Sequence, residues 1–223
     1  MDISNLIQTV LVLAIPVIFG ITLPAAMRGR VAHRFGDSTA MMMGRVSLNP
    51  IKHIDPIGTL LIPAVLYIVS AGQFLFGYAK PVPFDPRNLR NPRRDIIWVS
   101  LTAPLTNFAM AAGWGLLFIL LRSAGVEEPF FLKMAQGGVQ FNLVMWALNL
   151  FPLPPFDGGR VLMALLPSGP VQNFLFRIEP YGFFVVMGLM VAGIFSKFWL
   201  QPLVAFGATV LGALYTPFML LLS

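Results

Sequence analysis

Long apolar runs are the feature that most constrains what this chain can fold into. Most of them approach or exceed the roughly 20 residues that a helix needs to cross the hydrocarbon core of a bilayer. Hydrophobic residues make up 57% of the 223 positions and charged residues only 11%, whereas a soluble domain carries about 25% charged residues. The sequence therefore predicts an all-α integral membrane protein with about six transmembrane helices. The runs are Leu6–Met27, Ile57–Ala79, Ile96–Leu121, Phe130–Phe151, Tyr181–Phe195 and Phe198–Leu222.

The net charge of +6 comes mainly from two loops. Ten of the fifteen Lys and Arg residues lie between Arg28 and Arg94, on both sides of an apolar run. This pattern is typical of loops that flank a membrane on its cytoplasmic side, so the expected partner is the lipid bilayer and not nucleic acid. With no linker and no internal repeat, the sequence predicts one domain over residues 1–223 in a multi-pass, bacterial-type cell membrane.

The orientation of the first basic loop stays open. Residues 28–56 and 80–95 both favour the cytoplasmic side, yet one helix over Ile57–Ala79 would place them on opposite sides. Either that run is not a simple span, or the 28–56 segment returns part-way into the membrane. The acidic loop Ser123–Pro129 favours the cytoplasmic side for residues 80–95.

The segment 149–160, which reads NLFPLPPFDGGR, interrupts the apolar pattern after the fourth run. Its three prolines remove backbone donors and stop the helix, and the glycine pair that follows permits unusual backbone angles. Asp157 lies at this break. An ionisable group beside irregular backbone at membrane depth indicates a functional site, although Asp157 could also simply cap the next helix.

This segment resembles the second motif of the site-2 protease family of membrane-embedded zinc metallopeptidases. The matching residues are Asn149, Pro152, Pro154, Asp157, Gly158 and Gly159. The resemblance implies that Asp157 matches the family's third zinc ligand, that Asn149 assists the site, and that the proline-rich turn helps to position substrate. It extends over most of the chain, through GRVSLNPIKHIDPIG at 44–58, APLTN at 103–107 and EPYG at 179–182.

The first motif of that family, His-Glu-x-x-His, is absent from this sequence. Two histidines one helical turn apart would hold the metal, and the glutamate between them would serve as general base. In the matching register, Pro24 and Arg28 stand in the histidine positions and Ala25 in the glutamate position. None of these side chains can ligate a metal, so Asp157 is a vestigial ligand and no zinc is expected in this chain.

Two interpretations of the remaining polar side chains stay open. Arg28 is expected either to pair with Asp157, roughly where zinc would lie, or to extend outward to lipid headgroups. His33 and His53, the only histidines of the chain, could in principle join Asp157 in a different metal site. Ordinary surface or interfacial histidines are the simpler explanation, because both lie in or next to the basic loop.

Two function classes follow from the resemblance. One is a noncatalytic member, natural or deliberately altered, which keeps the fold and a groove for a transmembrane or unwound-helix segment of a partner. The other is an active zinc-dependent intramembrane endopeptidase with unforeseen ligands. The missing ligands and base favour the first, because function depends on the site and not on the fold. A transporter would predict inverted apolar halves, which the sequence lacks.

Overall fold

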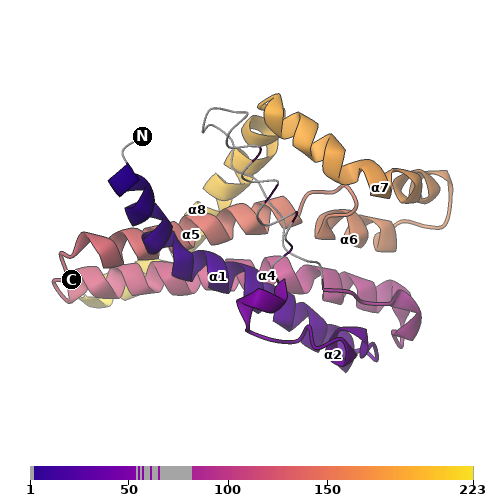
Figure 1. Ribbon diagram of the computed structural model, residues 1–223, viewed down its shortest axis with the longest axis horizontal. Helices are drawn as coiled ribbons and strands as arrows, with labels where there is room; N and C mark the ends of the chain where they lie inside the picture. Colours follow the sequence, from indigo (N-terminus) through magenta and orange to yellow (C-terminus); the bar gives the residue numbers. More distant parts are fainter. Residues whose placement is uncertain are drawn as a thin grey trace.

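The computed structural model describes residues 3–53, 55, 57, 61, 65 and 82–222. Every regular element among them is a helix (Figure 1). The long helices are α1 (Ile3–Arg34), α4 (Pro92–Ser123), α5 (Pro129–Asn149), α7 (Pro170–Val191) and α8 (Gln201–Leu222). The short ones are α2 (Thr39–Met42), η1 (Pro50–His53), η3 (Pro86–Asn88), α6 (Asp157–Leu165) and the π-helix η4 (Ser196–Leu200).

Four helical stretches of the described residues are long and apolar enough to cross a membrane: Leu11–Arg34, Pro92–Ser123, Pro170–Val191 and Ser196–Met219. The prediction of an all-helical, multi-pass membrane protein is therefore confirmed, but the count of six spans is not. The expected span Ile57–Ala79 lies almost wholly outside the described residues.

Two further expected spans differ from the structure. The run Phe130–Phe151 does form a helix, α5, but Lys133 and a series of Gln and Asn residues keep it below the hydropathy of the four spans. The expected helix Tyr181–Phe195 was placed wrongly, because α7 begins eleven residues earlier at Pro170 and ends at Val191. Its internal Pro180 does not break it, as is common in membrane helices.

Prolines and glycines set the ends of the long helices. Helices α4, α5 and α7 each begin with proline in the first turn, where a backbone N–H has no helical partner. Helix α4 is followed by Gly125 at φ 72°, and α7 by Gly193 at φ 72°. These are left-handed conformations that favour glycine after a helix C-terminus.

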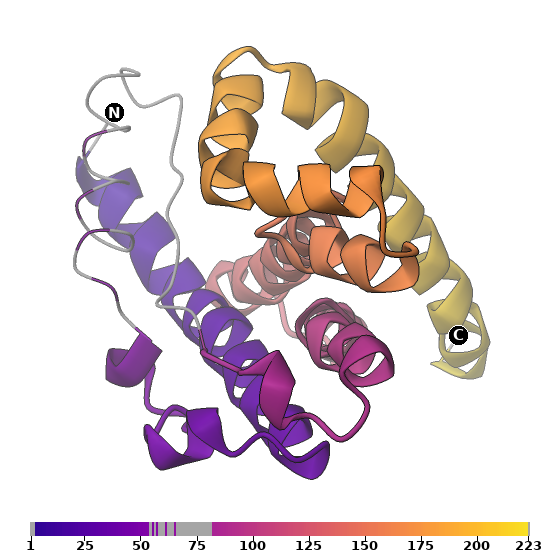
Figure 2. The ribbon, with the colours of Figure 1, turned by 90° about the vertical axis from the view of Figure 1, so that its right-hand side faces the viewer.

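Helices α1, α4 and α5 pack against one another, and α8 packs against α4 and α5 (Figure 2). A buried polar link joins α1, α4 and α5. The Asn107 side-chain amide donates to the Gly20 carbonyl and to the Asn142 side-chain oxygen, each over 3.0 Å. Such hydrogen bonds between helices compensate for the missing hydrophobic driving force inside a bilayer.

A buried carboxylate joins the two basic loops at one end of α1. The Asp37 side chain is 0% exposed and accepts from the backbone N–H groups of Thr39 (3.0 Å) and Asp85 (2.8 Å), and from the Asn88 side chain (3.1 Å). Burial acts to raise the pKa of the Asp37 carboxyl, but these hydrogen bonds outweigh it and hold the pKa below its ordinary value. The side chain is therefore ionised at neutral pH.

Asp37 brings the start of the first basic loop against the second, through its contacts with Thr39, Asp85 and Asn88. Val82 lies against Gly29 of α1, beside Val46 of the first basic loop. The structure thus places the described parts of both basic loops at the same end of the bundle, where both satisfy the cytoplasmic preference of Lys and Arg.

Candidate functional site

The interruption after α5 consists of the residues between Asn149 and Asp157, which form turns without helix. Close approach of backbone to backbone explains the glycine pair that follows. A Cβ at Gly158 would lie 2.1 Å from the Leu150 carbonyl oxygen, and one at Gly159 would lie 2.2 Å from the backbone of Leu153. The turn therefore folds tightly over the start of α6, and Asp157 becomes the first residue of that helix, 3% exposed.

Aromatic rings hold the other side of this turn. The Phe151 ring packs edge-to-face against Phe195 and Trp199, with ring centroids 4.9 and 5.1 Å apart. The Trp199 indole N–H donates to the Ala147 carbonyl at the end of α5 over 2.8 Å. The π-helix η4, which contains Trp199, thus anchors the segment that carries Asp157.

Arg28 reaches Asp157 from α1. Its guanidinium donates to the Asp157 carboxylate, and the two form an ion pair across 129 positions of sequence. The Arg28 side chain is 15% exposed and that of Asp157 is 4% exposed, so the pair is largely removed from water. Pro24, one turn earlier on α1, is buried, and Ala25 is half-buried.

A second ion pair continues this charge pattern along α6. Arg160, one turn after Asp157, lies 4.0 Å from the Glu179 carboxylate of α7, and its guanidinium lies 5.5 Å from the centre of the Phe84 ring. Positive and negative groups therefore alternate from α1 to α7, in the order Arg28, Asp157, Arg160, Glu179. The formal charges of these four side chains sum to zero.

The far end of α6 is held by Arg93 of α4. Its guanidinium donates to the carbonyl of Ala164 over 3.0 Å and to those of Leu165 (3.3 Å) and Leu166 (3.0 Å). These are carbonyls without helical partners at a C-terminus, where a cation is favourable. Both ends of this short helix are thus bound to arginines of neighbouring helices.

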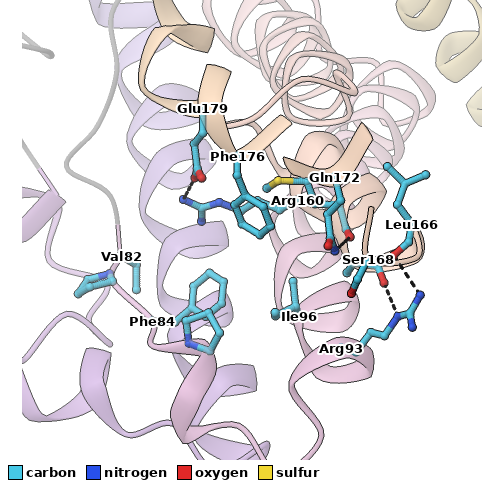
Figure 3. Close-up of a pocket in the computed structure, with 14 residues that line it drawn as sticks. Val82, Phe84, Arg93, Ile96, Arg160, Leu166, Ser168, Gln172, Phe176 and Glu179 are labelled. Carbon is cyan, nitrogen blue, oxygen red and sulfur yellow. Dashed lines mark hydrogen bonds and ion pairs between the residues drawn. The ribbon is translucent and has the colours of Figure 1, made fainter. Parts of the chain in front are cut away.

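A pocket of about 590 Å³ opens beside Arg160 (Figure 3). Residues 82–86 form one wall, and the starts of α4 and α7 and one face of α6 form the others. Its lining is mainly apolar, with Phe84, Ile96 and Phe176 among the large side chains, and Arg160 and Glu179 supply charge. The size suits a short stretch of peptide or a small molecule.

The sequence analysis did not identify Arg93, Arg160 or Gly182 as site residues. Arg160 directly follows the glycine pair, and the alternation of charge at one-turn spacing was a usable signal. The role of Arg93 depends on a contact across 71 to 73 positions, which no local pattern indicates.

Gly182 of α7 shows how closely that helix approaches the turn. A Cβ at this position would lie 1.7 Å from the Pro154 carbonyl oxygen. We expect Gly182→Ala to lower the free energy of unfolding by about 3 kcal/mol, because backbone must move to admit the methyl group. The thermal midpoint in a fixed detergent measures this.

Gly188 provides the matched control on the same helix, because a Cβ there meets nothing within 4 Å. Gly188→Ala is expected to leave the midpoint unchanged or slightly raised. Equal midpoints for the two variants would contradict the close packing of α7 on the turn.

The donor set does not fit zinc. Catalytic zinc needs about three protein ligands, and among the residues that the structure describes no group of three His, Cys, Asp or Glu side chains comes together. His33 instead contacts the Ser38 hydroxyl over 3.0 Å, and buried His53 contacts the Ser47 carbonyl over 2.7 Å. Asp157 has a guanidinium as its partner.

Comparison with known proteins gives two relatives. The chain is 37% identical over 188 residues to "Putative zinc metalloprotease YwhC" of Bacillus subtilis (strain 168), across 80% of each chain. It is 28% identical over 172 residues to "Putative zinc metalloprotease Rip2" of Mycolicibacterium smegmatis, across 76% of this chain and 62% of that protein. No family model matches the chain. No solved structure matches it.

Proposed function

Because this chain belongs to the site-2-protease-like family of YwhC, we propose that it is a noncatalytic member that keeps the scaffold, as one domain over residues 1–223, without the zinc chemistry. The ion pair between Arg28 and Asp157 carries this proposal. It supplies the cation that a buried carboxylate requires, and it does so with a side chain that cannot bind a metal.

The general base is missing as well as the ligands. In the register of the family motif, Ala25 takes the place of the glutamate that would activate water. The other carboxylate near the site, Glu179, lies beside Arg160 on α7. Hydrolysis of a peptide bond therefore lacks, in this arrangement of the described residues, both a set of three metal ligands and a free base.

We propose that the chain still binds a partner membrane protein, through a segment of that partner that is extended or unwound. The pocket beside α6 supports it, since apolar walls and one charged pair suit such a segment. The tight turn at Pro152–Pro155 follows α5, which ends at Asn149, and packs against the glycine pair at the start of α6.

The first test is metal content and cleavage. We expect the unmodified chain, purified from cells supplied with zinc, to carry far less than one zinc per molecule. It is expected to leave a membrane-helix substrate uncut while YwhC, tested in parallel, serves as the comparison. One tightly bound zinc together with cleavage would overturn the proposal and favour an active endopeptidase with ligands not foreseen here.

The second test concerns the partner. A photoreactive residue in place of Phe176, which lines the pocket, is expected to crosslink to a protein in native membranes. The same residue in place of Phe174, equally exposed on α7 but outside the pocket lining, is the matched control. Crosslinking that is equal at both positions would reject the pocket as the binding groove.

A further inference from the structure

The segment after α1, residues 39–53, folds back along that helix. A Cβ at Gly29 would lie 3.1 Å from the Ala40 side chain and 2.8 Å from that of Val46. Gly29 lies two residues after Met27, where the apolar run of α1 ends, which is about 3 Å along an α-helix. The segment therefore lies at the level where α1 leaves its apolar run.

The outer face of this segment is apolar and exposed. Ala40 and His53, by contrast, are buried against the protein at 0% and 1% exposure. A soluble protein seldom leaves so many large apolar side chains together in water. The exposed ones are Met41 (45%), Met42 (79%), Met43 (59%), Leu48 (57%) and Ile51 (74%).

Basic side chains accompany this face. Residues 39–53 contain Arg45 and Lys52 and no acidic residue. Among the described residues neither of the two forms an ion pair, and the Arg45 guanidinium donates to the Lys52 backbone carbonyl. The acceptor of that bond is a neutral carbonyl, so Arg45 keeps its positive charge.

We propose that residues 39–53 are an interfacial anchor that lies in the plane of the membrane surface. The Met, Leu and Ile side chains enter the boundary between headgroups and acyl chains, and Arg45 and Lys52 bind the phosphates of anionic lipids. The position beside the basic end of α1, an apolar outer face and the positive charge of Arg45 and Lys52 all fit a lipid surface. The anchor does not depend on whether the chain binds zinc.

The absence of cysteine from the chain makes a single-site test direct. A spin label at Met42→Cys is expected to be severalfold more accessible to oxygen, relative to a water-soluble nickel complex, than a label at Arg87→Cys. Arg87 lies in η3 at the same end of the molecule with its side chain 89% exposed. Equal accessibility at the two positions would overturn the anchor, and so would dipolar broadening between labels on two copies, which would show that a second copy covers this face.

The headgroup contacts have their own test in vesicles of phosphatidylcholine with and without phosphatidylglycerol. The label at position 42 is expected to lie deeper in the anionic vesicles, and Arg45→Gln with Lys52→Gln is expected to abolish that difference. Arg122→Gln with Lys133→Gln, which removes the same charge from α4 and α5, is the matched control and should preserve it. If the depth of the label at position 42 is the same in both kinds of vesicle, with or without the Arg45 and Lys52 substitutions, these two residues do not bind lipid headgroups.

Discussion

A chain that carries Pro24→His, Ala25→Glu and Arg28→His together is expected to bind one zinc ion per molecule. Positions 24 and 28 are one turn apart and share a face of α1, and the side chain at position 28 already reaches Asp157. Two imidazoles and one carboxylate would then supply the three protein ligands of a catalytic zinc site. Elemental analysis after removal of loosely bound metal measures the stoichiometry.

A bound structural or catalytic metal also stabilises the fold, because it binds the folded state alone. The triple variant should therefore melt at a higher temperature with zinc than with a chelator, whereas the unmodified chain should show no difference. Cleavage of a membrane-helix substrate by the triple variant then tests whether the rest of the site has been kept.

Three variants control this prediction. The triple variant with Asp157→Ala should lose the metal, since one ligand is removed. The variant that keeps Arg28 but carries Pro24→His and Ala25→Glu should not bind it. Leu23→His with Met27→His also places two imidazoles one turn apart, but on a different face of α1, and should fail likewise. No zinc in the triple variant would show that positions 24 and 28 do not face a metal cavity.

The second large effect is expected from breaking the Arg28 pair. Arg28→Met should lower the free energy of unfolding by about 3–5 kcal/mol, because it leaves the Asp157 carboxylate buried without its partner. Asp157 is 3% exposed, so water cannot readily replace the guanidinium. Unfolding in a fixed detergent, followed by temperature or denaturant, measures the loss.

The double variant Arg28→Met with Asp157→Leu separates the pair from simple packing. It should recover most of the lost stability, because removing both charges also removes the unpaired carboxylate. Arg177→Met, an exposed arginine on α7, should have little effect. If Arg28→Met costs no more than Arg177→Met, then Arg28 extends toward lipid headgroups instead, and the proposed replacement of the metal fails.

Much of the site could be anticipated because its logic is local. The register of the family resemblance places Pro24 and Arg28 in the ligand positions, and the proline and glycine content of residues 149–160 predicts the break at which Asp157 lies. The contact of Gly182 with Pro154 could not be anticipated in the same way, because it depends on how α7 crosses the turn.

Span boundaries were harder to predict for a physical reason. Helix α7 includes Arg177 and Glu179 before its most apolar part, and a search for uninterrupted apolar residues therefore starts too late. Glu179 is compensated by Arg160 in the structure, which no single-segment pattern reveals. Similarly, the two basic loops lie together because Asp37 accepts a hydrogen bond from the backbone of Asp85, which is 48 positions away in the sequence.

Under the proposed function, a zinc site at Asp157 cannot be built one substitution at a time in a chain with the Arg28–Asp157 pair. Arg28→His alone removes the guanidinium before a second imidazole exists, and Pro24→His alone places an imidazole beside a fixed positive charge. Neither step yields enough ligands for zinc, and the first also loses stability. Under the proposed function, single substitutions toward a zinc site are therefore opposed by the folding free energy that the Arg28–Asp157 pair contributes, even where proteolytic activity would be advantageous.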